Sequence, residues 1–453
     1  MNDKLTYNDL IIPEFVYSRK VGYIGNVEID IKDALTAVVL SGLSGIIVGH
    51  SEKGKSYYGK LLNKRYFGSK GLIVQGSGIE ENTDLITQMC KKISKEDAKT
   101  IVKEDVLASP YWLVEELGAI PKQLQSMFYS VGDGILPHEG REYLLGTKLD
   151  DMQYFCLLAT TNSIENGENA EYGNFGISRA AASRFHICID MRYYGRSMDD
   201  ILNIGLGSGF TDPRHSTLQE RTDISEKIFG AYKEIRETAR NPSLEELAAW
   251  YYISIGGANC LKETAHLKNE ENWHLECMDC DKDSECMTKY FNAFGLMRSN
   301  NTIGIYANAL AYLAKLKDPS AVIDAADAVF LASKFGLSGK IGIVNPVVKK
   351  QEYSGSEGQL IEDAIDKIRK DYKTNEAFIL ASLDKVSNGK KLTKFFEFDG
   401  KCGSFDDIDK KAQTHAIPIE PYTDNRSVGL SWFLTFIDKA ITSKEHKRTK
   451  QKS

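Results

Sequence analysis

A glycine-containing loop carries the residues best suited to chemistry, because it lies between an apolar strand and a helix. Residues 49–56 fit the pattern G-x-x-x-x-G-K-S, and the apolar segment 45–48 precedes them. In such a loop the backbone N–H groups turn toward phosphate oxygens, the lysine reaches the terminal phosphates, and the last hydroxyl binds magnesium. The alternative is a chance Gly-Lys-Ser loop without a ligand. We predict a site for ATP and Mg²⁺ formed by Gly49, His50, Ser51, Glu52, Lys53, Gly54, Lys55 and Ser56.

Two carboxylates follow a later apolar strand. The segment 111–114 is apolar and runs into Glu115 and Glu116. A magnesium ion beside the loop serine needs a carboxylate near it, so we expect Glu115 to hold the metal through water. Glu116 would then be the general base that polarises the attacking water. The alternative is an ordinary helix start, where acidic side chains are favourable in any case.

Two further polar residues follow the same pattern of strand ends and helix ends. Asn162 follows the apolar segment 155–158, and its amide could hydrogen-bond the attacking water or the terminal phosphate. The alternative for Asn162 is a turn-forming residue. Arg184 ends a short helix just before the apolar segment 186–189, and we expect it to reach into a neighbouring subunit's site as an arginine finger. The alternative for Arg184 is a surface residue at a helix end.

The elements that position these residues alternate between strand and helix. Apolar segments at 45–48, 72–74, 111–114, 155–158 and 186–189 are separated by helical segments, which predicts an α/β fold with a parallel sheet. We expect residues 1–215 to form this nucleotide-binding domain. Helical patterns at 224–240, 243–255 and 304–316 predict a helical lid domain over residues 216–338. Residues 339–453 are expected to form a small α+β C-terminal extension, with a strand at 340–344, a helix at 359–372 and a disordered basic tail.

Four of the eight cysteines are clustered within the predicted lid domain. Cys260, Cys277, Cys280 and Cys286 have the spacing C-x16-C-x2-C-x5-C, which suits a metal site in a reducing compartment. Structural zinc, an iron-sulfur cluster and the absence of any metal all remain open from this spacing. A metal would fasten an insertion in the lid and would take no part in hydrolysis.

The overall charge bears on whether the protein binds nucleic acid or an acidic membrane. The net charge of -6 gives no global reason to expect DNA or an acidic membrane as a partner. The first residues carry no apolar signal segment, and the apolar stretch at 34–48 is too short and interrupted to span a bilayer. We therefore expect a cytoplasmic protein with no membrane partner.

The order of these elements resembles that of MoxR-type AAA+ ATPases. Residues 49–56, 114–116, 159–162 and 183–185 resemble the family's Walker A, Walker B, sensor 1 and arginine-finger elements, and 140–143 resembles its hairpin before sensor 1. The resemblance covers roughly residues 30–195. Where the family usually has aspartate at the first Walker B acid, this chain has Glu115. The resemblance implies a P-loop NTPase core of the AAA+ type with a helical lid domain.

The resemblance also implies how such a protein would work. It implies a homo-oligomeric ring, most often a hexamer, that hydrolyses ATP at subunit interfaces to remodel a protein client, in some cases with a von Willebrand factor A domain protein. One alternative is a nucleic-acid translocase, which is disfavoured because segment 131–142 contains more acidic than basic residues. Another alternative is an ATP-dependent assembly scaffold with little hydrolysis.

Overall fold

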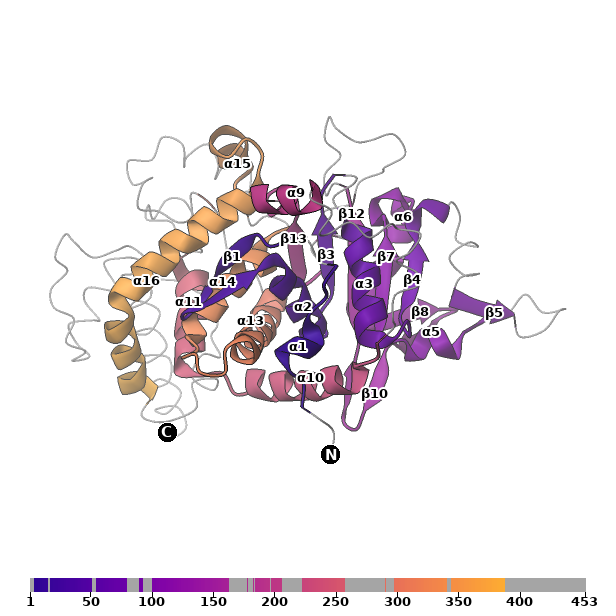
Figure 1. Cartoon of the computed structure of the whole chain (residues 1–453), viewed down its shortest axis with the longest axis horizontal. Helices are drawn as coiled ribbons and strands as arrows, with labels where there is room; N and C mark the ends of the chain where they lie inside the picture. Colours follow the sequence, from indigo (N-terminus) through magenta and orange to yellow (C-terminus); the bar gives the residue numbers. More distant parts are fainter. Residues whose placement is uncertain are drawn as a thin grey trace, which may run out of the picture. The chain divides into compact units, whose positions relative to one another are not determined.

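Figure 1 shows the computed structural model of the chain, which describes residues 4–14, 17–50, 54–79, 89–92, 100–162, 177, 182, 184–195, 197–205, 222–256, 290, 297–339 and 344–387. The chain divides into two compact units. The first comprises Met1–Asn241, Asn301–Asp324 and Phe335–Ile341, and the second comprises Pro242–Asn300, Ala325–Lys334 and Gly342–Ser453. The domain boundaries expected at residues 215/216 and 338/339 stay predictions.

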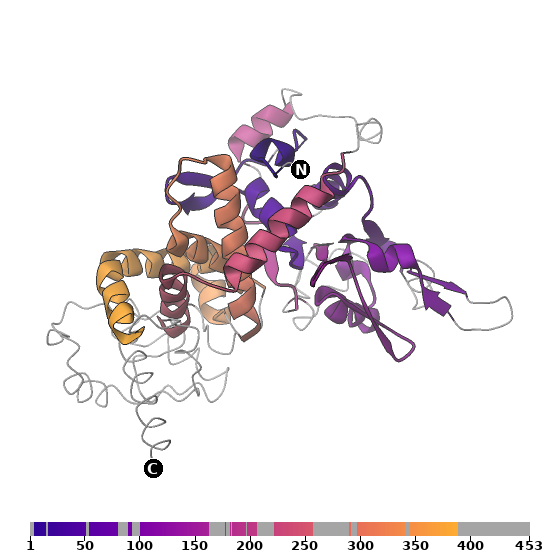
Figure 2. The ribbon, with the colours of Figure 1, turned by 90° about the horizontal axis from the view of Figure 1, so that it is seen from below.

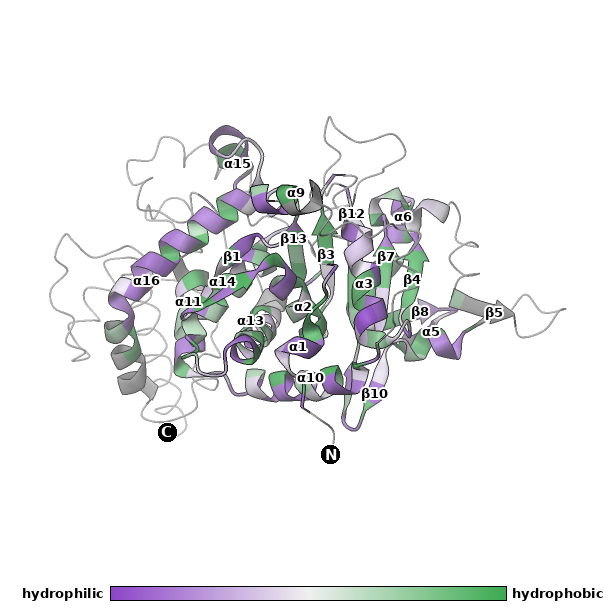
Figure 3. Cartoon of the chain, in the orientation of Figure 1, coloured by the Kyte–Doolittle hydropathy of each residue, from purple (hydrophilic) through white to green (hydrophobic). Residues whose placement is uncertain are grey.

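Five parallel strands form the central sheet of the first unit, in the order β13-β3-β12-β7-β4. They are β3 (Gly45–Val48), β4 (Leu72–Gln75), β7 (Tyr111–Glu115), β12 (Cys156–Thr161) and β13 (Ile187–Asp190). The five strands predicted for the parallel sheet are all present. Every residue of β3, β7, β12 and β13 is buried, as expected of a parallel sheet covered on both faces. Figure 3 shows these strands as largely hydrophobic.

Helices and a hydrophobic cluster cover the two faces of the sheet. On one face α3 (Lys55–Phe67) contacts β7 and β12, and α2 (Ile31–Ser41) contacts β12 and α10 (Ser225–Ala239). Gly59 lets α3 approach closely, because a Cβ there would lie 2.5 Å from Leu113 Cδ1. On the other face Trp112 and Val114 join a buried cluster with residues of α5 (Glu104–Ala108) and α7 (Met127–Gly132). The alternation of side chains along β7 therefore seals both faces.

Among the residues that the structure describes, four antiparallel hairpins lie outside the sheet. They are β1 (Lys20–Ile24) with β2 (Val27–Asp30), β5 (Cys90–Lys92) with β6 (Thr100–Val102), β8 (Ile135–His138) with β9 (Arg141–Leu144), and β10 (Thr147–Leu149) with β11 (Met152–Tyr154). The β8–β9 turn has positive φ at both Glu139 (47°) and Gly140 (74°), as two-residue hairpin turns favour. This is the hairpin that the sequence predicts before the strand of Asn162. Figures 1 and 2 both show the β5–β6 hairpin projecting from the sheet.

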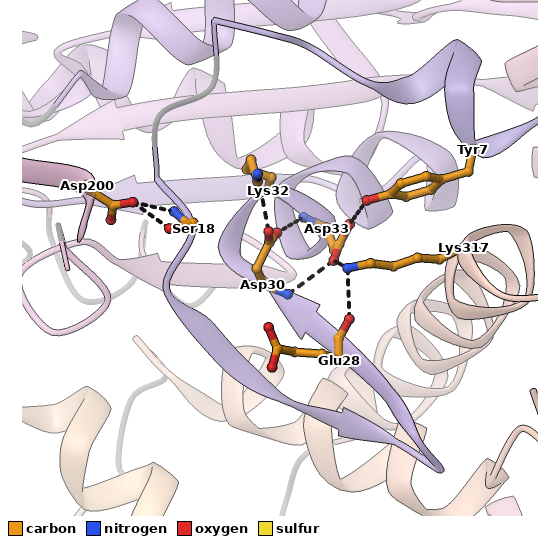
Figure 4. A network of polar contacts seen from close by, with 8 residues as sticks. All are labelled: Tyr7, Ser18, Glu28, Asp30, Lys32, Asp33, Asp200 and Lys317. Atoms are coloured by element: carbon orange, nitrogen blue, oxygen red, sulfur yellow. Dashed lines mark hydrogen bonds and ion pairs between the residues drawn. The ribbon is translucent and has the colours of Figure 1, made fainter. Parts of the chain in front are cut away.

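A polar network ties the N-terminal segment to the first helices of the first unit (Figure 4). Asp30 and Asp33 form a capping box at the start of α2, and Tyr7 of α1 (Tyr7–Leu10) donates to Asp33 Oδ1 at 3.1 Å. Lys317, at the end of α13 (Met297–Lys317), donates to Asp33 Oδ2 at 2.7 Å and to the Glu28 carbonyl at 2.8 Å. Burial, followed by the charge of Asp33, raises the pKa of Asp30. The network fixes where α2 begins, and α2 leads directly into β3.

The described residues of the second unit are helical. Its elements are α11 (Leu244–Gly256), α15 (Pro346–Glu352) and α16 (Glu357–Ser387), with the first part of α14 (Ala325–Leu337). Lys334 is buried between Glu362 and Asp366, and Arg369 donates to buried Asp327 at 2.8 Å. The predicted helix at 359–372 is confirmed as part of the longer α16. Residues 340–343 of the expected strand lie outside the described residues, as does the chain beyond residue 387.

Short helices complete the first unit at the edge of the sheet. They are α6 (Lys122–Gln125), α9 (Met198–Gly205) and the 3-10 turns η1 (Gly76–Gly78) and η2 (Leu117–Ala119). Within the described ranges, none of the helices combines the length and the hydrophobicity that a bilayer span requires.

Candidate functional site

The predicted phosphate loop connects the end of β3 to the start of α3. Gly49 N–H donates to the Thr161 carbonyl at 3.1 Å, which joins the loop to the end of β12. Gly54 precedes the helix with a left-handed backbone, φ 70°, a conformation that glycine adopts without steric cost. Gly54 has no side chain to cap the first N–H groups of α3. A helix whose first N–H groups bind a phosphate group is expected to begin in this way. Ser51, Glu52 and Lys53 lie outside the described residues.

Lys55 joins the loop to the predicted polar residue at the end of β12. Its side chain is buried, and Nζ donates to the carbonyls of Gly49 and His50, both at 2.7 Å, and to Asn162 Oδ1 at 3.1 Å. The structure therefore brings Lys55 and Asn162, which are far apart in the sequence, into direct contact. An ammonium group at this position suits the binding of a phosphate.

Glu115 contacts side chains from α3 and β4, which both lie against β7. Its carboxylate is buried, with Lys60 Nζ of α3 at 2.9 Å from Oε1 and Gln75 Nε2 of β4 at 3.4 Å from Oε2. The pair of Lys60 and Glu115 lies on the α3 side of the sheet, one turn beyond Ser56. Neither partner was predicted from the sequence, because the contacts depend on how α3 and β4 pack against β7. The expected metal role of Glu115 stays a prediction.

Glu116 has a left-handed backbone, with φ 52° and ψ 50°, which is uncommon for a residue other than glycine. Two neighbours hold this conformation. The Glu116 N–H donates to Thr160 Oγ1 at 3.1 Å, and the Glu116 carbonyl lies against Gly76, where a Cβ would come within 2.5 Å of that oxygen. The predicted general base therefore lies on a backbone whose direction β12 and η1 fix.

Thr160 is a further residue of the site to which the sequence had assigned no role. The residue is 1% exposed, and Oγ1 lies 3.4 Å from Ser56 Oγ as well as 3.1 Å from Glu116 N. The signal in the sequence was the pair of threonines, Thr160 and Thr161, that ends the apolar strand just before Asn162. A hydroxyl at that depth needs a hydrogen-bond partner. The structure supplies the partners from the loop and from the acidic pair.

The other predicted residues lie apart from this cluster or outside the described residues. Arg184 is partly buried and lies just before β13, the edge strand beside β3. A role for Arg184 in a neighbouring subunit stays a prediction. Among the residues that the structure describes, no group of three or more His, Cys, Asp or Glu could hold a metal ion. The four clustered cysteines, Cys260, Cys277, Cys280 and Cys286, lie outside the described residues.

Comparison with known proteins yields a resemblance in fold alone. No family model matches the chain, and no curated protein matches it. Among solved structures, the crystal structure of a proposed ATPase from Cytophaga hutchinsonii ATCC 33406 is similar, with a TM-score of 0.47 and 14% sequence identity over 74% of this chain and 87% of that chain. So distant a likeness assigns no activity. The parallel sheet, its strand order and the loop between β3 and α3 nevertheless fit the core of a P-loop ATPase.

Proposed function

We propose that this chain is an ATPase of the AAA+ type with a P-loop site at the carboxyl edge of its sheet. The observation that carries the proposal is the meeting of Lys55 with Asn162, beside Ser56, Thr160 and the acidic pair. If the Gly-Lys-Ser loop were a chance match, these polar side chains would not be expected to lie together at the end of a buried sheet. The strand order supports the proposal, because β12 lies between the loop strand β3 and the acidic strand β7.

Each side chain has a role that follows from its chemistry. Lys55 would pair with the terminal phosphates, and the N–H groups at the start of α3 would hold phosphate oxygens. Ser56, with Glu115 through water, would hold magnesium, which supplies positive charge to the phosphate oxygens. Glu116 would accept a proton from the attacking water, and Asn162 would orient that water.

The ring and its partners belong to the same proposal. We propose that the chain forms a homo-oligomeric ring, a hexamer, in which Arg184 acts in the site of a neighbouring subunit. The ring would remodel a protein client. The MoxR resemblance supports this assembly and a von Willebrand factor A domain protein as partner. A zinc or iron-sulfur site at the cysteine cluster and a cytoplasmic location remain parts of the proposal.

The deciding experiment measures ATP hydrolysis per subunit over a range of protein concentrations. We expect Lys55→Met to abolish hydrolysis and weaken nucleotide binding, while Lys64→Met on the same helix leaves both unchanged. The expected specific rate rises with concentration and collapses when Arg184→Ala subunits are mixed into wild type. A wild-type chain that binds no ATP would overturn the proposal. A rate that is independent of both concentration and mixing would overturn the shared site and leave the ATPase intact.

A further inference from the structure

Thr160 lies where the loop and the acidic pair come together. Its strand, β12, pairs with β3 on one side and with β7 on the other. From this central position its buried Oγ1 accepts the Glu116 N–H at 3.1 Å and lies 3.4 Å from Ser56 Oγ. One hydroxyl therefore touches both the residue proposed to hold magnesium and the backbone of the proposed general base.

The hydrogen-bonding capacity of a hydroxyl makes this arrangement directional. Threonine has one O–H donor and two acceptor lone pairs. Glu116 occupies one lone pair of Thr160, which leaves the second free to accept from Ser56. A serine hydroxyl that gives electron density to a metal becomes a stronger donor, because the cation polarises its O–H bond. The 3.4 Å separation is long for two hydroxyls, so it has room to shorten when Ser56 becomes the better donor.

The side chain type suits this role. Threonine is branched at Cβ, which restricts rotation about its first side-chain bond. Thr160 is buried in β12, so its methyl group is shielded from water while the hydroxyl keeps one direction. Glu116, in turn, has a left-handed backbone that needs its surroundings to hold it, and the Thr160 hydroxyl and Gly76 contact this backbone.

We propose that Thr160 is a positioning residue that couples Ser56 to Glu116, so that the general base is aligned when Ser56 holds magnesium. This inference rests on the proposed ATPase function and adds a residue to its machinery. Thr160 itself touches neither the phosphate nor the water. Its contribution is to hold the Glu116 backbone, and through it the direction of the carboxylate, in register with the metal ligand.

The test compares Thr160→Val, which removes the hydroxyl at nearly constant shape, with Thr160→Ser, which keeps it. We expect Thr160→Val to lower kcat by about 100-fold, the loss that a displacement near 1 Å causes, with ATP affinity in EDTA unchanged. Thr160→Ser should retain most of the rate. Thr36→Val is the matched control, because Thr36 has a buried hydroxyl that bonds Tyr66 away from the site.

Amide hydrogen exchange gives a readout that does not depend on turnover. In Thr160→Val the Glu116 amide should exchange faster than in wild type, and adding magnesium with a slowly hydrolysed ATP analogue should no longer slow it. If melting shows that Thr160→Val is unfolded, Thr160→Ala takes its place in both measurements.

The outcomes separate the two proposals. Wild-type hydrolysis together with a Thr160→Val variant of unchanged kcat and unchanged Glu116 exchange would overturn the coupling alone. A loss of rate that Thr160→Ser shares in full would also overturn it, because the hydroxyl would then not be the cause. A wild-type chain without ATP binding or hydrolysis would overturn the ATPase function and the coupling with it.

Discussion

Replacement of Gly76 by alanine tests how the acidic pair is held. Gly76 begins η1, directly after β4, and lies against the backbone of the acidic pair. A Cβ at this position would come within 2.5 Å of the Glu116 carbonyl oxygen and 2.6 Å of the Glu115 carbonyl oxygen. Both contacts are with backbone atoms, so no side chain can rotate out of the way.

The magnitude follows from this overlap. Ordinary contact with a Cβ begins at 3.4 Å, so the Glu116 carbonyl at 2.5 Å must move by roughly 1 Å. We expect the added methyl group to lower the free energy of unfolding by about 1–3 kcal/mol, as overpacking usually does. A displacement of this size at a catalytic group lowers the rate by about 100-fold. Because Lys55 and Ser56 lie on another element, the affinity for ATP should change little.

The assay measures kcat, ATP affinity and chemical unfolding for Gly76→Ala beside Gly78→Ala. Gly78 lies in the same 3-10 turn, and a Cβ there meets no atom within 4 Å, so its variant should behave as wild type. Equal kcat and equal stability for the two variants would refute the reasoning, because it would mean that the close approach of Gly76 to the acidic pair has no consequence. A loss in both variants would point instead to the flexibility of the turn.

Three further predictions concern charged groups. Glu116→Gln should lower kcat by about 100-fold or more while a fluorescent ATP analogue still binds, and normal turnover would show that Glu116 is not the base. Lys60→Met should lower the magnesium concentration needed for nucleotide binding, because Lys60, at 2.9 Å from Glu115, would no longer compete with the metal for this carboxylate. Since the Lys60 side chain is 46% exposed, the free energy of unfolding should change by less than about 1 kcal/mol. Burial alone would raise the pKa of Asp9, but hydrogen bonds, first among them that from Lys227, lower this pKa below its ordinary value of 3.8. The ionised Asp9 carboxylate therefore stabilises the folded protein above that pH, and this stabilisation is lost as the pH falls. Unfolding of Asp9→Asn and wild type should therefore differ by at most about 1 kcal/mol at neutral pH and converge in acid, whereas a constant difference would contradict this.

The sheet could be predicted from the sequence because each of its strands has a recognisable pattern within its own short segment. Strands buried on both faces read as continuous apolar runs, and each run here is followed by a loop or a polar residue. The helix at 359–372 was also predictable from its periodicity. Its extent was not, because the predicted helix ended at residue 372, whereas α16 continues through residues 373–376 to Ser387. A salt bridge between Lys373 and Glu376, at 3.0 Å, supports the helix there.

The site could be predicted only where one segment carries the signal. Gly54, Lys55 and Ser56 were predictable because the loop pattern is contiguous. The ion pair of Lys60 with Glu115 was not, because it depends on which strand α3 covers. The left-handed backbone of Glu116 was equally hidden, since nothing local in the sequence requires it. It follows from contacts with β12 and η1, which are known only after the strand order is known.

The position of β12 beside β3 explains why the end of one strand contacts both Lys55 and Ser56. Thr160 and Asn162 are two positions apart, so along an extended segment they point to the same side. Lys55 and Ser56 are consecutive at the start of α3, and Asn162 meets the first while Thr160 meets the second. A slip of one residue in the pairing of β12 would turn both side chains away together. The lysine proposed to bind phosphate and the serine proposed to bind metal therefore depend on a single register, and that register also sets the Glu116 amide on Thr160.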